Sequence, residues 1–201
     1  MTNKGFSIVE VIFAVVIATV IGFVITIFAR DIIKLNASAQ SSMTAMLESR
    51  KILSVMVTEL RSILPSALGS YPIEAVSTST VIFFADVNSD DIADRVRYFI
   101  DLPTLSVKRG VTLATGEPPG YSGVETFSTL ITDIANGTST ALFEYYDGNF
   151  AGTSTPLSLP VNIQAVRLVR ITIKVERDPN RGPELMTLTS EAALRNLKDN
   201  L

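Results

Sequence analysis

The stretch FADVNSDDIADRV carries side-chain oxygens at alternate positions, which is a pattern that can bind a cation. Counted from the first aspartate, the oxygen-bearing side chains stand at positions 1, 3, 5 and 9, and a backbone carbonyl is available at position 7. The five residues are Asp86, Asn88, Asp90, Asp94 and, for the carbonyl, Ile92. Calcium is a hard cation that prefers such oxygen ligands. The spacing therefore indicates a possible calcium loop.

Two positions of this loop depart from the EF-hand-like pattern that it resembles. That pattern has Gly at the sixth position and a bidentate acid at the twelfth. Here the sixth residue is Asp91 and the twelfth is Arg97. Asp, Asn and Ser are also ordinary turn residues, so a solvated turn joining two strands is the alternative.

Glu10 is the second residue whose position needs a chemical explanation. It is the only charged residue between Phe6 and Ala29. At about 1.5 Å per residue, this apolar run is long enough to cross a hydrocarbon core of about 30 Å. A carboxylate in such a segment costs a few kcal/mol, which makes it a functional hypothesis.

The composition narrows the chemistry that the rest of the chain can perform. The 201 residues include no His, Cys or Trp, and the formal net charge is -3. Thiol nucleophiles, disulfides and the commonest general base are therefore excluded. Because there is also no paired-carboxylate, G-x-S-x-G or phosphate-loop motif, we expect no enzyme and no cofactor beyond possible calcium. The charge balance favours no nucleic-acid partner.

Charges flank the apolar run on both sides. Lys4 precedes it, and Arg30, Asp31 and Lys34 follow it. This predicts a single-pass protein of the cytoplasmic (inner) membrane, with the short N-terminus cytoplasmic and the bulk exported. A secretory signal fits poorly, because its apolar region is shorter and ends in a small-x-small cleavage site, which FARDIIKL lacks. A plain signal anchor fits the length but leaves Glu10 unexplained.

The segment KGFSIVEVIFAVVIA resembles the class III leader of type IV pilins, minor pilins and type II secretion pseudopilins. The resemblance implies that a prepilin peptidase removes a leader, residues 1–5, by cutting after Gly5. Phe6 then becomes the N-methylated mature N-terminus. A carboxylate on one subunit can face the new ammonium on its neighbour, since a buried pair costs less than a lone buried charge. Glu10 would then set the register of assembly; the alternative is a carboxylate that snorkels or protonates without a partner.

One long helix is expected after the leader. Residues 6–64 contain no Pro and only one Gly, Gly22, so we predict a helix with a membrane-spanning part, 6–29, and an amphipathic part, 30–64, ended by Pro65. Apolar residues recur there at three- and four-residue spacing, which predicts a face that packs on a globular head. They are Met43, Met46, Leu47, Leu53, Met56, Val57, Leu60, Ile63 and Leu64.

The remaining residues, 65–201, predict a β-rich head. Six segments are rich in β-branched and aromatic residues: 80–85, 94–101, 104–109, 140–147, 165–176 and 184–190. SALGSYPIEAVSTST is predicted to be a connecting loop, and within 110–139 the stretch FSTLITDIA could be helix or strand. The expected fold class is α+β, a long N-terminal helix packed on an antiparallel sheet, which is the architecture of pilins.

Parts of the head resemble J-type pseudopilins and PilW-type minor pilins. The similar segments are RVRYFIDLPTLSVKRG, LFEYYDGN, VRLVRITIKV and EAALRNL. The resemblance implies a structural subunit, a minor pilin or pseudopilin, of a type IV pilus, type II secretion or related filament. Its partners would be other pilin or pseudopilin subunits, prepilin peptidase and, before assembly, the membrane. A major pilin and a membrane-tethered extracytoplasmic binding or adhesion domain are the alternatives. An exported enzyme that works with carboxylates is a third, disfavoured by the missing motifs.

Overall fold

The computed structural model describes residues 5, 7–136, 140–176 and 185–197. Most of the expected leader, and Phe6 with it, lies outside the described residues. The chain divides into two compact units, Met1–Thr44 and Ala45–Leu201, and each is described by itself below. The α+β class predicted from the sequence is confirmed, with one long N-terminal helix and antiparallel sheets.

Helix α1 runs from Ile8 to Arg61. No proline interrupts it, and its single glycine, Gly22, does not break it. The predicted end at Leu64 is three residues too late. The reason is a backbone hydrogen bond: the Leu64 N–H donates to the Phe84 carbonyl at 2.9 Å and so leaves the helical ladder. The position of Pro65 would allow the helix to continue to Leu64, but the hydrogen bond from Leu64 to Phe84 ends it earlier.

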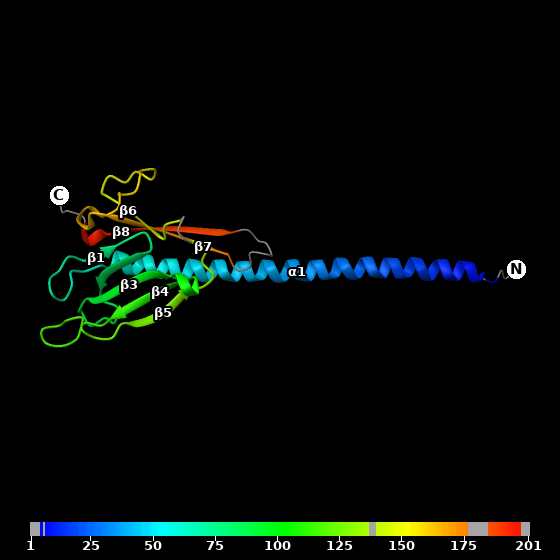
Figure 1. Ribbon diagram of the computed structural model, residues 1–201, viewed down its shortest axis with the longest axis horizontal. Helices are drawn as coiled ribbons and strands as arrows, with labels where there is room; N and C mark the ends of the chain where they lie inside the picture. The colour runs from blue at the N-terminus through cyan, green and yellow to red at the C-terminus, as the bar shows by residue number, and fades with distance from the viewer. Residues whose placement is uncertain (1–4, 6, 137–139, 177–184, 198–201) are drawn as a thin grey trace. The chain divides into compact units, whose positions relative to one another are not determined.

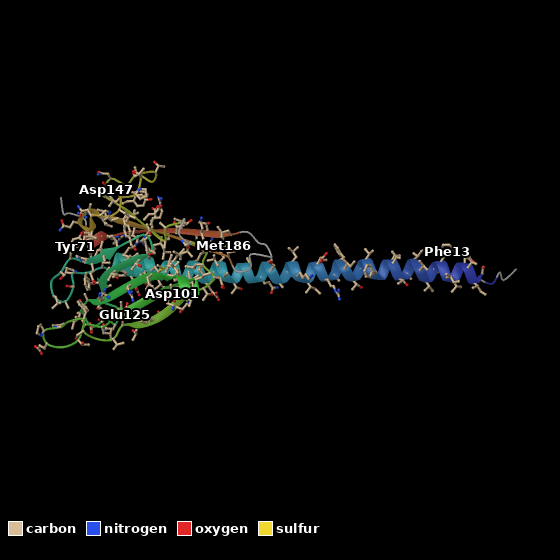
Figure 2. The ribbon with its side chains drawn as sticks, in the orientation of Figure 1. Phe13, Tyr71, Asp101, Glu125, Asp147 and Met186 are labelled. Carbon is tan, nitrogen blue, oxygen red and sulfur yellow. The ribbon has the colours of Figure 1, made fainter. Side chains whose placement is uncertain are left out.

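The part of α1 in the first unit exposes its apolar side chains. Figure 2 shows Phe13 projecting from the helix, where it is 64% exposed. The hydroxyls of Thr19 and Thr26 donate to the carbonyls of Val15 and Gly22, each at 2.8 Å, so these polar groups are satisfied within the helix. By length and composition, α1 is able to cross a membrane.

The second unit contains a five-stranded antiparallel sheet in the order β1-β2-β3-β4-β5. Each strand pairs with the next along the chain, as in a meander (Figure 1). The strands are β1 Ile73–Val76, β2 Thr80–Ala85, β3 Asp94–Asp101, β4 Ser106–Thr112 and β5 Thr126–Ile131. The observed bounds of β2 and β3 equal the predicted ones.

A three-stranded antiparallel sheet, in the order β6-β7-β8, completes the second unit. Its strands are β6 Phe143–Tyr146, β7 Leu168–Val175 and β8 Met186–Ala193. Short 3-10 helices lie at Leu102–Thr104, Ile163–Ala165 and Arg195–Leu197. Along β7, buried and partly exposed residues alternate without exception, as in a strand with one solvent-facing side.

Two sequence predictions for the head need correction, and one open choice is decided. The expected loop at 66–80 contains β1. The stretch within 110–139 that could be helix or strand forms β5, which is a strand. The segment predicted as a strand over 104–109 begins later, at Ser106, because Leu102–Thr104 forms a 3-10 turn. Beyond residue 109 the strand continues to Thr112, paired with β3 and β5.

The core of the second unit forms where the C-terminal part of α1 meets both sheets. The helix contributes four apolar side chains that are at most 6% exposed, and Ile63, just after the helix, adds a fifth: Leu53, Met56, Val57, Leu60 and Ile63. Two residues that we assigned to this packing face do not belong to it, since Met43 and Leu47 are 70% and 65% exposed. The face begins instead with two small buried residues, Ala45 and Ser49, at four-residue spacing.

Candidate functional sites

Glu10 lies in the first turn of α1 and turns back toward the start of the helix. The backbone N–H of Ser7 donates to Glu10 Oε2 at 3.3 Å, and the Ser7 carbonyl accepts from Val11 N at 3.2 Å. A Ser followed three residues later by a Glu that reaches back to its amide is the signature of a capping box. Our sequence analysis overlooked this S-x-x-E signal. Glu10 thus has a local role, which any account of its function must separate from pairing with another subunit.

Gly5 lies just before the helix and is exposed. A Cβ built on Gly5 would have no heavy atom within 4 Å. The chain's own packing therefore does not require a glycine at this position. If glycine is required there, the requirement comes from a molecule that acts on the chain.

The loop between β2 and β3 is organised by the first of the predicted calcium ligands, Asp86. Its Oδ1 accepts hydrogen bonds from Ser89 N at 2.7 Å and Asp90 N at 3.3 Å, while Oδ2 accepts from Asp91 N at 3.1 Å. Ser89 and Asp91 have φ angles of 63° and 66°, in the left-handed region. Asp91 thus adopts at the sixth position the conformation for which the EF-hand-like pattern uses glycine.

The next two predicted ligands contact each other. Asn88 Nδ2 donates to Asp90 Oδ2 at 2.7 Å, and Asp90 Oδ1 accepts from Ile92 N at 2.9 Å. An amide oxygen and nitrogen are interchanged by a half-turn of the side chain, so Asn88 can present either to the loop. The Ile92 carbonyl is the fourth predicted ligand.

Arg97, at the twelfth position, is directed elsewhere. Its Nε and Nη2 donate to Glu125 Oε1 and Oε2 at 2.8 Å and 2.7 Å. Glu125 lies across Gly110, where an added Cβ would stand 2.0 Å from Glu125 Oε1. The glycine in β4 therefore makes room for this ion pair.

Asp94, the last predicted ligand, is buried, with 1% of its surface exposed. Its Oδ1 accepts from Ala114 N at 2.8 Å, whereas its Oδ2 is buried without a hydrogen-bond partner among the described residues. Burial raises the pKa of Asp94; the amides of Ala114 and Val87 lower it, and the charges of Asp90 and Asp86 raise it further. Within the described residues, no three acidic side chains converge into a ready-made metal centre.

Tyr121, in the Gly-rich stretch after β4, makes internal contacts. Its hydroxyl accepts from Ala67 N at 2.8 Å and donates to the Ala93 carbonyl at 2.7 Å, while its ring packs 5.1 Å from that of Phe84. Burial raises its pKa. Tyr121 thus ties the segment after α1 to the β2–β3 loop, which is a structural role.

Tyr121 also lines a shallow hollow with Tyr71 and Glu74. The Glu74 carboxylate is engaged by Arg95, with Nε at 2.6 Å and Nη2 at 3.0 Å. Both oxygens of Glu74 are therefore engaged by Arg95.

A polar cluster that the sequence analysis missed joins α1 to the five-stranded sheet. Arg109 Nη2 and Nε donate to Glu59 Oε1 and Oε2 at 2.8 Å and 3.1 Å, and the Tyr98 hydroxyl donates to Glu59 Oε2 at 2.6 Å. Burial and the adjacent Glu59 carboxylate raise the pKa of Tyr98, which keeps the phenol protonated. The only sequence signal was an acid on the packing face of the helix.

Comparison of the chain with known protein families and with curated proteins finds no match.

Proposed function

We propose that the chain is a structural subunit, a minor pilin or pseudopilin, of a filament of the type IV pilus or type II secretion class. One observation carries the proposal. The first part of α1 is apolar and exposed on its surface, and the single charge within it, Glu10, stands five residues after a Lys4-Gly5 sequence. Such a surface is stable in lipid or against other apolar helices. The membrane would provide the lipid before assembly, and the filament would provide the neighbouring helices afterwards.

Processing would give Glu10 a partner. Cleavage after Gly5 creates an ammonium group on Phe6, at the same end of the apolar segment. A lone buried charge is strongly disfavoured, whereas a buried pair is much less so. If neighbouring helices are staggered along their axes, Glu10 of one subunit faces the ammonium of the next, and the pair fixes the stagger.

The capping contact of Glu10 with Ser7 supplies a competing explanation. A carboxylate that only caps the helix needs an acceptor oxygen and no charge, because Gln serves equally in a capping box. A carboxylate that pairs with an ammonium needs its charge. The two roles can therefore be separated by substitution at this one residue.

The experiment compares Glu10→Gln and Glu10→Val with the wild-type chain in a host that assembles the filament. Glu10→Gln keeps the acceptor for Ser7 N and loses the charge, and Glu10→Val loses both. Glu48→Gln, which neutralises an exposed acid on the same helix, is the matched control. Fractionation then measures the amount of mature subunit in the membrane and in purified filaments.

We expect all variants to reach the membrane and to be cleaved, because Val and Gln make insertion easier than Glu does. Glu10→Val should lose most of its incorporation into filaments, since a broken buried pair costs on the order of 3–5 kcal/mol. Glu10→Gln should fall clearly below the wild type, and Glu48→Gln should equal it. Normal incorporation of Glu10→Gln would assign Glu10 to capping alone, and normal incorporation of Glu10→Val would refute the assembly role.

A further inference from the structure

The unpaired oxygen of Asp94 is the feature of the head that its own contacts leave unexplained. A buried carboxylate oxygen without a donor is costly, and native proteins usually satisfy such an atom by a hydrogen bond, a water or an ion. Only 1% of the Asp94 surface is exposed, and of its two carboxylate oxygens only Oδ1 accepts a hydrogen bond from the described residues. Asp94 is the first residue of β3 and pairs with Ala85, the residue before Asp86, so its carboxylate stands at the base of the β2–β3 loop.

Asp86 and Asp90 add two carboxylates to that of Asp94 in this loop. Arg95 is bonded to Glu74, and Arg97 is bonded to Glu125, so the two cations that follow Asp94 in the chain are already paired. Three carboxylates held in one loop repel one another unless a cation offsets their charge. A cation with oxygen ligands would offset this charge and satisfy Asp94 Oδ2.

We propose that the β2–β3 loop binds one calcium ion, with Asp94 Oδ2 as its buried ligand. Asp86, Asn88, Asp90 and the Ile92 carbonyl supply the other protein oxygens. Asp86 accepts three backbone hydrogen bonds in the loop, and a carboxylate has about four lone-pair sites, so one remains for the ion.

Binding would require two local adjustments. Asn88 must turn its amide so that the oxygen replaces the nitrogen now directed at Asp90, and Asp90 must then turn toward the ion. Calcium tolerates flexible geometry and takes six to eight oxygens, the remainder coming from water. Because Arg97 stands where a strong loop has a bidentate acid, the affinity should fall in the weak extracellular range of about 10⁻⁴–10⁻³ M.

Calorimetry with calcium chloride on the full chain in zwitterionic detergent tests the proposal, together with melting midpoints in calcium and in chelator. Asp94→Asn keeps an acceptor for Ala114 N and removes the charge, so its fold should survive. Asp90→Ala, in the exposed part of the loop, is a second variant in case Asp94→Asn fails to fold. Asp147→Asn is the control, because Asp147 also braces a turn, by accepting from Asn149 N at 2.9 Å, but lies after β6.

We expect the wild type to bind one calcium ion and to melt at a higher temperature in calcium than in magnesium or chelator. Asp94→Asn and Asp90→Ala should each weaken binding at least about tenfold, and Asp147→Asn should bind as the wild type does. The proposal is overturned if the wild type gives neither heat nor a midpoint shift at about 10 mM calcium. It is equally overturned if either loop variant binds calcium with wild-type affinity.

Discussion

Glu59 on α1 and Arg109 on β4 are joined by two hydrogen bonds of 2.8 Å and 3.1 Å, although 50 residues separate them in the chain. Both side chains are 20% exposed. Tyr98 on β3 donates to the same carboxylate, so one acid on the helix holds two adjacent strands. The contact fixes how the C-terminal part of α1 is rotated against the five-stranded sheet.

Replacing Glu59 by Ala should destabilise the head, because Arg109 and the Tyr98 hydroxyl would lose their partner in a mostly buried place. An exposed pair is worth about 0–1 kcal/mol and a broken buried pair costs about 3–5 kcal/mol, so we expect a loss of about 2–3 kcal/mol. Thermal or denaturant melts of the full chain in detergent measure it. Glu48→Ala, an exposed acid on the same helix, should melt like the wild type; equal midpoints for both variants would show that the cluster contributes nothing.

A charge placed on the packing face of α1 should unfold the head, whereas the same charge on the outer face should not. Leu60 is 1% exposed and Leu47 is 65% exposed. Leu60→Asp, like Leu53→Asp, buries an unpaired carboxylate and should cost at least about 3 kcal/mol. Leu47→Asp is the control, with a change of about 0.5 kcal/mol or less. The same melts decide, and a wild-type midpoint for Leu60→Asp would mean that the helix does not pack on its own sheets.

Tyr121→Phe should weaken the tie between the segment after α1 and the β2–β3 loop. The hydroxyl both accepts from Ala67 N and donates to the Ala93 carbonyl, so its removal leaves two backbone groups without a partner. We expect a loss of about 1–3 kcal/mol. Tyr71→Phe is the control, since Tyr71 lines the same hollow and its hydroxyl bonds to none of the described residues. Equal melting midpoints for the two variants would contradict the bridging role.

The parts of the fold that the sequence predicted well are strands rich in β-branched and aromatic residues. The bounds of β2 and β3 follow from that composition. The strand that was missed, β1, and the strand that was left undecided, β5, lie at opposite edges of their sheet. Four of the six residues of β5 are exposed, so it lacks the pattern of buried and exposed positions on which strand prediction depends.

The predictions for the sites had a similar limit. Spacing identified the loop residues from Asp86 to Asp94, but only coordinates reveal that Asp94 Oδ2 is buried without a donor. The cluster of Glu59, Arg109 and Tyr98 could not be predicted, because it depends on which strands the helix packs against. For Glu10, the S-x-x-E pattern was legible in the sequence and predicts the capping contact with Ser7.

Leader removal should depend on Gly5 even though the fold does not. Apart from its chain neighbours, a Cβ at this position meets none of the described residues within 4 Å, so Gly5→Val should insert and fold as the wild type does. We expect it to keep residues 1–5, because the peptidase must accommodate the residue at the cut. Gly22→Val, which also adds a side chain in open space, should be processed normally. Processing of Gly5→Val at the wild-type rate would remove the reason for assigning the cut to this position.

The intact mass of the wild-type chain, extracted from the membrane of a host with an active prepilin peptidase, tests the central claim most directly. The account predicts a chain that has lost Met1–Gly5 and has gained one methyl group, located on Phe6 by fragmentation of the N-terminal peptide. A membrane protein with a plain signal anchor would keep its first five residues unmethylated. A mass equal to that of the full 201-residue chain would contradict the assignment to the pilin class.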